Sequence, residues 1–482
     1  MKQPPSESRS RVFIATAAIG VCAWLGCFMA FAQGQPATGR WEDPTLALVK
    51  PAILPRPDAS AGAAIRPDET IAVVQRLADF GTRHTLSEAE SQTRGIGAAR
   101  RWVLEQFRVA GPRLEASLEE FEAPAGPRIK APARVANVVA VLPGSDPAAA
   151  ARRIYVVAHL DSMNANVMDP VGDAPGANDD ASGCAVVIGC ARALANQSLR
   201  ATVVFLCTIG EEQGLVGAKY HADAARTRND NIVGVLNNDI VGDPSAPPAD
   251  GFPAQPGYVR VFSEGLPRDG SQETWSKIRA LSAESDSPSR QLARFVADVA
   301  AWEGVTVQPR LVFRPDRFLR GGDHSMFNQA GFPAVRFTAS NETYSRQHQN
   351  VSGPPQIGGG QARETGDVVR WVDADYLANV ARLNAKSLIC LANSPQTPAR
   401  ARVITAKLEN ESTIRWDASP DADGYEIVWR DTTSPMWTHA RDVGNVTSVT
   451  LPISKDDYFL GVRAYRSDGY RSIVAFADQA KE

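Results

Sequence analysis

Three apolar runs of the sequence are each followed by side chains that can bind metal ions or move protons. The runs cover residues 154–158, 201–207 and 232–236. Such runs are typical of parallel strands buried on both faces, and in open α/β sheets ligands bind beyond the carboxyl ends of the strands. An acidic turn, 175–183, lies between the first two runs. We therefore expect these side chains to meet at one rim of a sheet: His159, Asp179, Glu211, Glu212 and Asp239.

The residue types at this rim suit a pair of metal ions and a proton carrier. So many carboxylates are buried together only if cations lie among them, and a mixed imidazole and carboxylate shell suits zinc. Asp179 stands at an expected helix start and could reach both ions. Glu211 and Glu212 are adjacent, so one is expected to bind metal and the other to take a proton from water. Asp161 follows His159 by two residues and could accept the second imidazole N–H.

Several motifs along the chain resemble the zinc exopeptidase family of the bacterial leucyl aminopeptidase type. They occur in the family's order between residues 68 and 391. The motifs are His159-x-Asp161, Gly176-Ala177-Asn178-Asp179-Asp180-x-Ser182-Gly183, Glu211-Glu212-x-Gly214-Leu215-x-Gly217, Asn238-Asp239, Asp323-His324 and a later histidine, His348.

The resemblance implies two Zn²⁺ per chain and assigns a ligand role to five residues. One ion would be bound by His159 and Asp239, the other by Glu212 and His348, and Asp179 would bridge them. The reaction implied is hydrolysis of the N-terminal peptide bond of peptides or proteins.

The resemblance also implies catalytic roles beyond the ligands. Glu211 would be the general base and later the proton donor to the leaving amine, while Asp161 would support His159. The family's leucyl aminopeptidases carry an oxyanion-binding tyrosine shortly before the Asp-His pair, and this sequence has none there. Arg320 is the candidate substitute, because its guanidinium can donate to a tetrahedral intermediate.

Three alternative functions stay open at this point. Glutaminyl cyclases share the implied fold but use one zinc, and the presence of both His159 and Asp239 favours two. Carboxypeptidase specificity within the same fold is a second alternative. A non-catalytic binding ectodomain is the third, although this chain retains every implied ligand.

The N-terminus and composition bear on localisation and partners. A basic start, the apolar run from Val12 to Phe31 and small residues at Ala30 and Ala32 predict a signal peptide over 1–32, hence export to the periplasm or medium. The alternative is an uncleaved membrane anchor, because the run is long enough to span. A net charge of −3 gives no basic footprint for nucleic acid. Four later cysteines are expected as buried thiols: Cys184, Cys190, Cys207 and Cys390.

The remaining pattern predicts two folded domains. Residues 33–67 are Pro- and Ala-rich, which predicts an extended, loosely held lead. Residues 68–393 form the expected α/β catalytic domain, a mixed, mostly parallel sheet flanked by helices. After a linker at 394–400, short alternating strands over 401–482 resemble a fibronectin type III β-sandwich, expected to contact a surface, a protein or a glycan.

Overall fold

The computed structural model describes residues 43–244, 255–267, 270–351 and 365–481. Its contacts separate a short N-terminal unit ending at Leu46 from a larger unit that begins at Ala47, which is described below. The predicted signal peptide lies outside the described residues. No helix among the described residues has the length and apolar character needed to cross a membrane.

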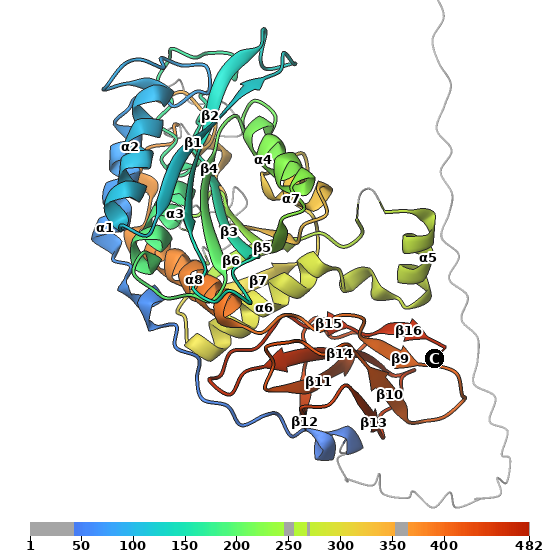
Figure 1. Ribbon diagram of the computed structural model, residues 1–482. Helices are drawn as coiled ribbons and strands as arrows, with labels where there is room; N and C mark the ends of the chain where they lie inside the picture. Colours follow the sequence, from blue (N-terminus) through green and yellow to red (C-terminus); the bar gives the residue numbers. More distant parts are fainter. Residues whose placement is uncertain (1–42, 245–254, 268–269, 352–364, 482) are drawn as a thin grey trace, which may run out of the picture. The chain divides into compact units, whose positions relative to one another are not determined.

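One eight-stranded mixed sheet forms the centre of the α/β domain, in the order β1-β2-β4-β3-β5-β8-β6-β7 (Figure 1). The four middle strands, β4, β3, β5 and β8, run parallel, and β2 and β6 join their two sides in antiparallel orientation. At the edges, β1 is antiparallel to β2, whereas β7 is parallel to β6. The strands are β1 (Glu115–Ala123), β2 (Ala133–Leu142), β3 (Arg152–His159), β4 (Thr202–Thr208), β5 (Asn231–Asn238), β6 (Tyr258–Ser263), β7 (Gln308–Val312) and β8 (Ala334–Ala339).

Helices cover both faces of this sheet. Helices α1, α2, α3, α6 and α8 share an apolar core with one face, and α4 and α7 pack on the other. The helices are α1 (Pro67–Ala78), α2 (Gly95–Ala110), α3 (Ala181–Leu194), α4 (Val216–Thr227), α5 (Gln272–Ala280), α6 (Pro288–Glu303), α7 (His324–Gln329) and α8 (Ala374–Asn393).

Side-chain alternation along the middle strands explains why the runs are apolar throughout. In β3, Ile154, Val156 and Ala158 enter the core below α3, whereas Tyr155 and Val157 enter the core below α4. A strand covered on both faces needs an apolar residue at every position. The predicted mixed α/β sheet is therefore confirmed, with its three central runs as β3, β4 and β5.

The C-terminal residues form two small four-stranded sheets that face each other across one core. The orders are β13-β10-β9-β16 and β12-β11-β14-β15. Ile414 and Val403 from one sheet pack with Trp429 and Val462 from the other. The strands are β9 (Arg402–Ile404), β10 (Ser412–Arg415), β11 (Gly424–Asp431), β12 (His439–Gly444), β13 (Ser448–Leu451), β14 (Tyr458–Tyr465), β15 (Ala475–Phe476) and β16 (Asp478–Ala480). The predicted sandwich is present, and its fibronectin type III likeness stays a prediction.

Buried polar contacts connect this sandwich to the α/β domain. Asp286 accepts from Arg294 of α6 at 3.1 Å and from Arg430 of β11 at 2.7 Å, with both guanidiniums buried. The Trp437 indole donates to Gln291 of α6 at 2.9 Å. The sandwich is therefore held against α6 and is not attached through residues 394–400 alone.

The lead segment before α1 is also better anchored than its composition indicated. Ala52 donates its backbone N–H to Glu426 of the sandwich at 2.8 Å, and the Tyr470 hydroxyl donates to the Asp58 carbonyl at 2.8 Å. From residue 47 onward the segment is therefore held by the domains it follows. The cysteines at positions 184, 190, 207 and 390 are buried free thiols, as predicted.

Candidate metal centre

The ends of three neighbouring parallel strands place the predicted ligands. His159 is the last residue of β3, Asp239 follows β5 directly, and Glu211 and Glu212 lie three and four residues beyond β4. Because β4, β3 and β5 are adjacent and parallel, their carboxyl ends lie at the same rim.

A turn between β3 and α3 brings Asp179 to this rim. Gly176 in this turn has a φ of +50°, and a Cβ there would lie 2.5 Å from the Asp179 carbonyl oxygen, so glycine is required. Asp180 accepts from the Gly183 N–H at 2.9 Å and is the N-cap of α3, as expected for a cap. The turn thereby positions Asp179 one residue before the cap.

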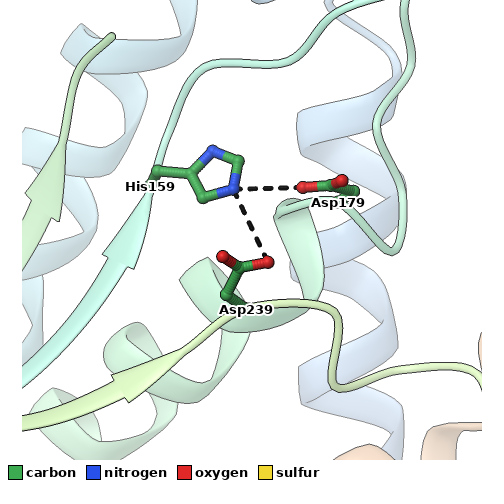
Figure 2. A group of neighbouring side chains, drawn as sticks. All are labelled: His159, Asp179 and Asp239. Atoms are coloured by element: carbon green, nitrogen blue, oxygen red, sulfur yellow. Dashed lines mark ion pairs between the residues drawn. The ribbon is translucent and has the colours of Figure 1, made fainter. Parts of the chain in front are cut away.

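His159, Asp179 and Asp239 form the first group of candidate ligands (Figure 2). The Nε2 atom of His159 lies 3.0 Å from Oδ1 of Asp179 and 3.9 Å from Oδ1 of Asp239. All three side chains are buried.

Asp179, Glu212 and His348 form the second group. The Nε2 atom of His348 lies 2.8 Å from Oδ2 of Asp179 and 3.0 Å from Oε1 of Glu212. The two carboxylate oxygens of Asp179 therefore belong to different groups. The five residues that the resemblance implied as ligands meet in two adjacent sets that share one residue.

The donor atoms in both groups fit a divalent cation such as zinc. Each group offers one imidazole nitrogen and two carboxylate oxygens, with the ligand atoms within 4.8 Å of one another. Three protein ligands with a position left for water are typical of catalytic zinc sites. The buried Oε1 atom of Glu212 accepts no hydrogen bond from the described residues, although His348 is close to it. A cation would satisfy this acceptor.

Burial and neighbouring charges shift the pKa values of His159 and Asp179. Burial opposes the charged form of His159, but nearby carboxylates, Asp180 foremost, raise its pKa well above the usual value. Burial also opposes ionisation of Asp179, yet the charges of His348 and His159 hold its pKa well below its usual value. Positive charge nearby is thus what favours the ionised form of Asp179 in a buried place.

Asp161 makes contacts that differ from those expected. The Nδ1 atom of His159 lies 3.1 Å from the backbone carbonyl oxygen of Asp161, whereas the carboxylate is 3.8 Å away. The carboxylate instead accepts the backbone N–H groups of Glu211 and Glu212 at 3.2 and 3.1 Å. The expected hydrogen bond between the His159 imidazole and the Asp161 carboxylate is therefore not formed. The carboxylate is held instead by the two backbone N–H groups in the turn after β4.

Glu211 lines a cavity of about 540 Å³ that opens beside both ligand groups. Among the described residues its carboxylate has no ion-pair partner closer than 4.0 Å, unlike that of Glu212. Burial raises the pKa of Glu211 well above its usual value, with His159 opposing this and Glu212 adding to it. Glu211 and Glu212 therefore face different surroundings, as their adjacency predicted.

Arg320 lines the same cavity. Its Nη1 atom lies 3.3 Å from Nδ1 of His348, and its guanidinium lies 5.5 Å from the Tyr344 ring centre. The structure therefore brings Arg320 next to His348 of the second ligand group.

Two further residues hold the ligands and were missed in the sequence. Asp367 accepts the backbone N–H groups of Asn178 and Asp179, both at 2.7 Å. Burial raises its pKa to about 7, against these two hydrogen bonds. Arg336 of β8 forms an ion pair with Oδ1 of Asp239 at 2.7 Å. An arginine within an apolar strand is a signal that could have identified Arg336, whereas no pattern marks Asp367.

Comparison with known proteins identifies a matching family and relatives of similar length. Residues 137–372 match peptidase family M28. A probable zinc metalloprotease of Pyricularia oryzae is 40% identical over 452 residues, which cover 90% of this chain and 88% of the relative. Another, of Leptosphaeria maculans, is 40% identical over 412 residues, covering 84% and 93%.

Among solved structures, the LapA aminopeptidase of Legionella pneumophila is 17% identical with a TM-score of 0.49, covering 72% of this chain and 79% of that one. A glutaminyl cyclase of Fimbriiglobus ruber has 16% identity and a TM-score of 0.47, covering 67% and 95%. From the family match and the identity to its curated relatives, this chain belongs to peptidase family M28 and is a zinc-dependent peptidase.

Proposed function

We propose that this protein is an exported aminopeptidase that uses two zinc ions and Glu211 to hydrolyse the N-terminal peptide bond of peptides. One observation carries the two-ion proposal. Asp179 offers one carboxylate oxygen to the group with His159 and Asp239, and the other to the group with Glu212 and His348. Two complete sets of three ligands favour a dinuclear enzyme over a one-zinc glutaminyl cyclase.

Zinc ions bound in these groups would activate a water molecule and polarise the scissile carbonyl. In the proposed reaction, Glu211 accepts the proton of the attacking water and then donates it to the leaving amine. This role of Glu211 is supported by the position of its carboxylate, which lines the cavity and has no ion-pair partner among the described residues. The Arg320 guanidinium would stabilise the negative charge that develops on the carbonyl oxygen. Asp161 would hold the turn that carries Glu211 and Glu212.

Export and the action of the C-terminal sandwich are separate parts of the proposal. Export rests on the predicted signal peptide over 1–32. The sandwich would position the enzyme on a surface, a protein or a glycan, and contribute no catalytic residue.

The proposal is tested with a peptide library digested by the zinc-loaded protein and read by mass spectrometry. Loss of single residues from the N-terminus, abolished by a chelator and restored by zinc, is the expected result. Trimming from the C-terminus would establish a carboxypeptidase instead, and no cleavage would support a binding ectodomain. Metal analysis of the same sample should give two zinc ions per chain, and one ion would favour the cyclase alternative.

A further inference from the structure

The cavity beside the ligand groups is lined by an unusual set of charges. Its acidic lining residues are Asp179, Glu211, Glu212 and Asp239, all of which are already assigned to ligand groups or to proton transfer. Its basic lining residues besides His348 are four arginines: Arg128, Arg317, Arg320 and Arg336.

Two of these arginines are neutralised by carboxylates. Arg336 contacts Asp239 at 2.7 Å and Asp316 at 3.0 Å. Arg317 contacts Asp316 at 3.2 Å and also pairs with Glu342. The guanidiniums of Arg317 and Arg336 are therefore already paired with carboxylates of the protein.

The other two have no carboxylate partner among the described residues. Arg320 contacts only uncharged or imidazole groups, namely Gln347, His348 and the Tyr344 ring. Arg128 donates from Nη1 to the backbone carbonyl of Glu212 at 2.6 Å, and its Nε and Nη2 atoms donate to no described residue. Both guanidiniums therefore stand next to the second ligand group.

The charge of the loaded site follows from this arrangement. Two divalent cations would balance the four acidic side chains that line the cavity, and Asp316 and Glu342 pair with Arg336 and Arg317. Arg128 and Arg320 are then the lining cations without a carboxylate partner among the described residues. A cleft with surplus positive charge favours anionic substrates. Arg128 is an exposed residue whose guanidinium is directed towards the cavity by its contact with the Glu212 carbonyl, and a guanidinium fork matches a carboxylate.

We propose that Arg128 is a specificity residue that binds a carboxylate of the peptide substrate, with Arg320 adding to the attraction. This inference rests on the proposed peptidase function. The carboxylate belongs either to the C-terminus of a short peptide or to an acidic side chain, and one chemistry recognises both. A protein with this pocket selects short or acidic peptides over long neutral ones.

The test compares matched substrates of the zinc-loaded full chain. One pair is Leu-Gly-Gly with a free C-terminus and the same peptide as its C-terminal amide. The second pair is Leu-Glu-Gly-amide and Leu-Gln-Gly-amide. We expect kcat/KM to be at least about 10-fold higher for the charged member of one pair, and the pair that responds identifies the source of the carboxylate. The preference should shrink as salt is added, because screening weakens an exposed charge interaction.

Substitutions of Arg128 test whether this residue causes the preference for the charged substrate. Arg128→Gln should bring the charged-to-neutral ratio close to one, and Arg128→Lys should restore part of it, with zinc content measured in each variant. Lys130→Gln is the matched control, because Lys130 is an exposed cation on the same β1–β2 hairpin that does not line the cavity. It should leave the wild-type ratio unchanged.

The outcomes separate the two proposals. Equal hydrolysis within both pairs would overturn the carboxylate proposal and leave the peptidase function intact. A preference that survives Arg128→Gln would also overturn it, because another group would then bind the carboxylate. No hydrolysis of any peptide would overturn the proposed function and this inference with it.

Discussion

The Asp367 carboxylate holds the peptide that carries Asp179, by accepting its backbone N–H at 2.7 Å. Its second oxygen accepts the N–H of Asn178 at the same distance. Both carboxylate oxygens are thus used to fix one turn, and this turn supplies the ligand shared by the two groups. The position of Asp179, the candidate bridging ligand, therefore depends on a residue 188 positions further along the chain.

Asp367→Asn should weaken zinc binding about 10–100-fold, as is usual when a partner of a metal ligand is lost. The amide can accept only one of the two N–H groups, and its own NH₂ group faces the other. Competition with a chelator measures the affinity. Asp373→Asn is the control, because Asp373 only caps α8 and asparagine is an equally good N-cap. An Asp367 variant with wild-type affinity would contradict the assigned role.

Replacing different ligands should change the zinc stoichiometry in different ways. Glu212→Gln removes a carboxylate from the second group alone, so about one ion per chain should remain after dialysis. Asp179→Ala damages both groups and should leave less than one. Metal analysis by mass spectrometry gives the count. Equal losses in the two variants would show that Asp179 is not shared.

Glu211→Gln should keep both ions and lose hydrolysis by about 10²–10⁴-fold, the usual contribution of a general base. Glutamine retains the size of the side chain but cannot accept the proton. Activity on amino-acid nitroanilides and zinc content are measured on one preparation. A fully active variant would show that another group accepts the proton.

Arg320→Ala should lower kcat about 10²–10³-fold, the usual effect of removing one oxyanion donor, while zinc content is kept. The guanidinium lies beside His348 and is not among the candidate ligands. Steady-state kinetics separate kcat from KM, and unchanged turnover would end the assignment. Arg320→Lys keeps the charge, so it should retain part of the turnover that alanine loses.

Glu426 should make the stability of the metal-free protein depend on pH. Burial opposes its ionisation, but Arg463 and Arg471 outweigh burial and lower its pKa. A lowered folded-state pKa means that the stabilisation is present above the unfolded-state pKa of about 4.3 and is lost as the pH falls further. Glu426→Gln should therefore melt below wild type at pH 7, and the difference should narrow towards pH 3. A difference in Tm that is constant with pH would contradict this.

The sequence alone could predict the ligands because their signals are local. His159, Glu212 and Asp239 each follow an apolar run, and parallel buried strands bring the residues after their carboxyl ends to one rim. The acidic turn with its glycine likewise identified Asp179. His348 follows no strand, so it was identified from the family pattern alone, and only the fold brings it to Glu212.

Tertiary structure decided the partners of these residues. Asp161 was expected to bind the imidazole, yet the packing of the turn after β4 offers its carboxylate two N–H groups instead. Asp367, Arg336 and Arg128 come from distant segments, and their spacing to the ligands carries no periodic signal. A sequence pattern records which face of a strand is buried and where it ends, because these depend on neighbouring residues. Which charges meet across the fold depends on how whole elements pack, and that was visible only in three dimensions.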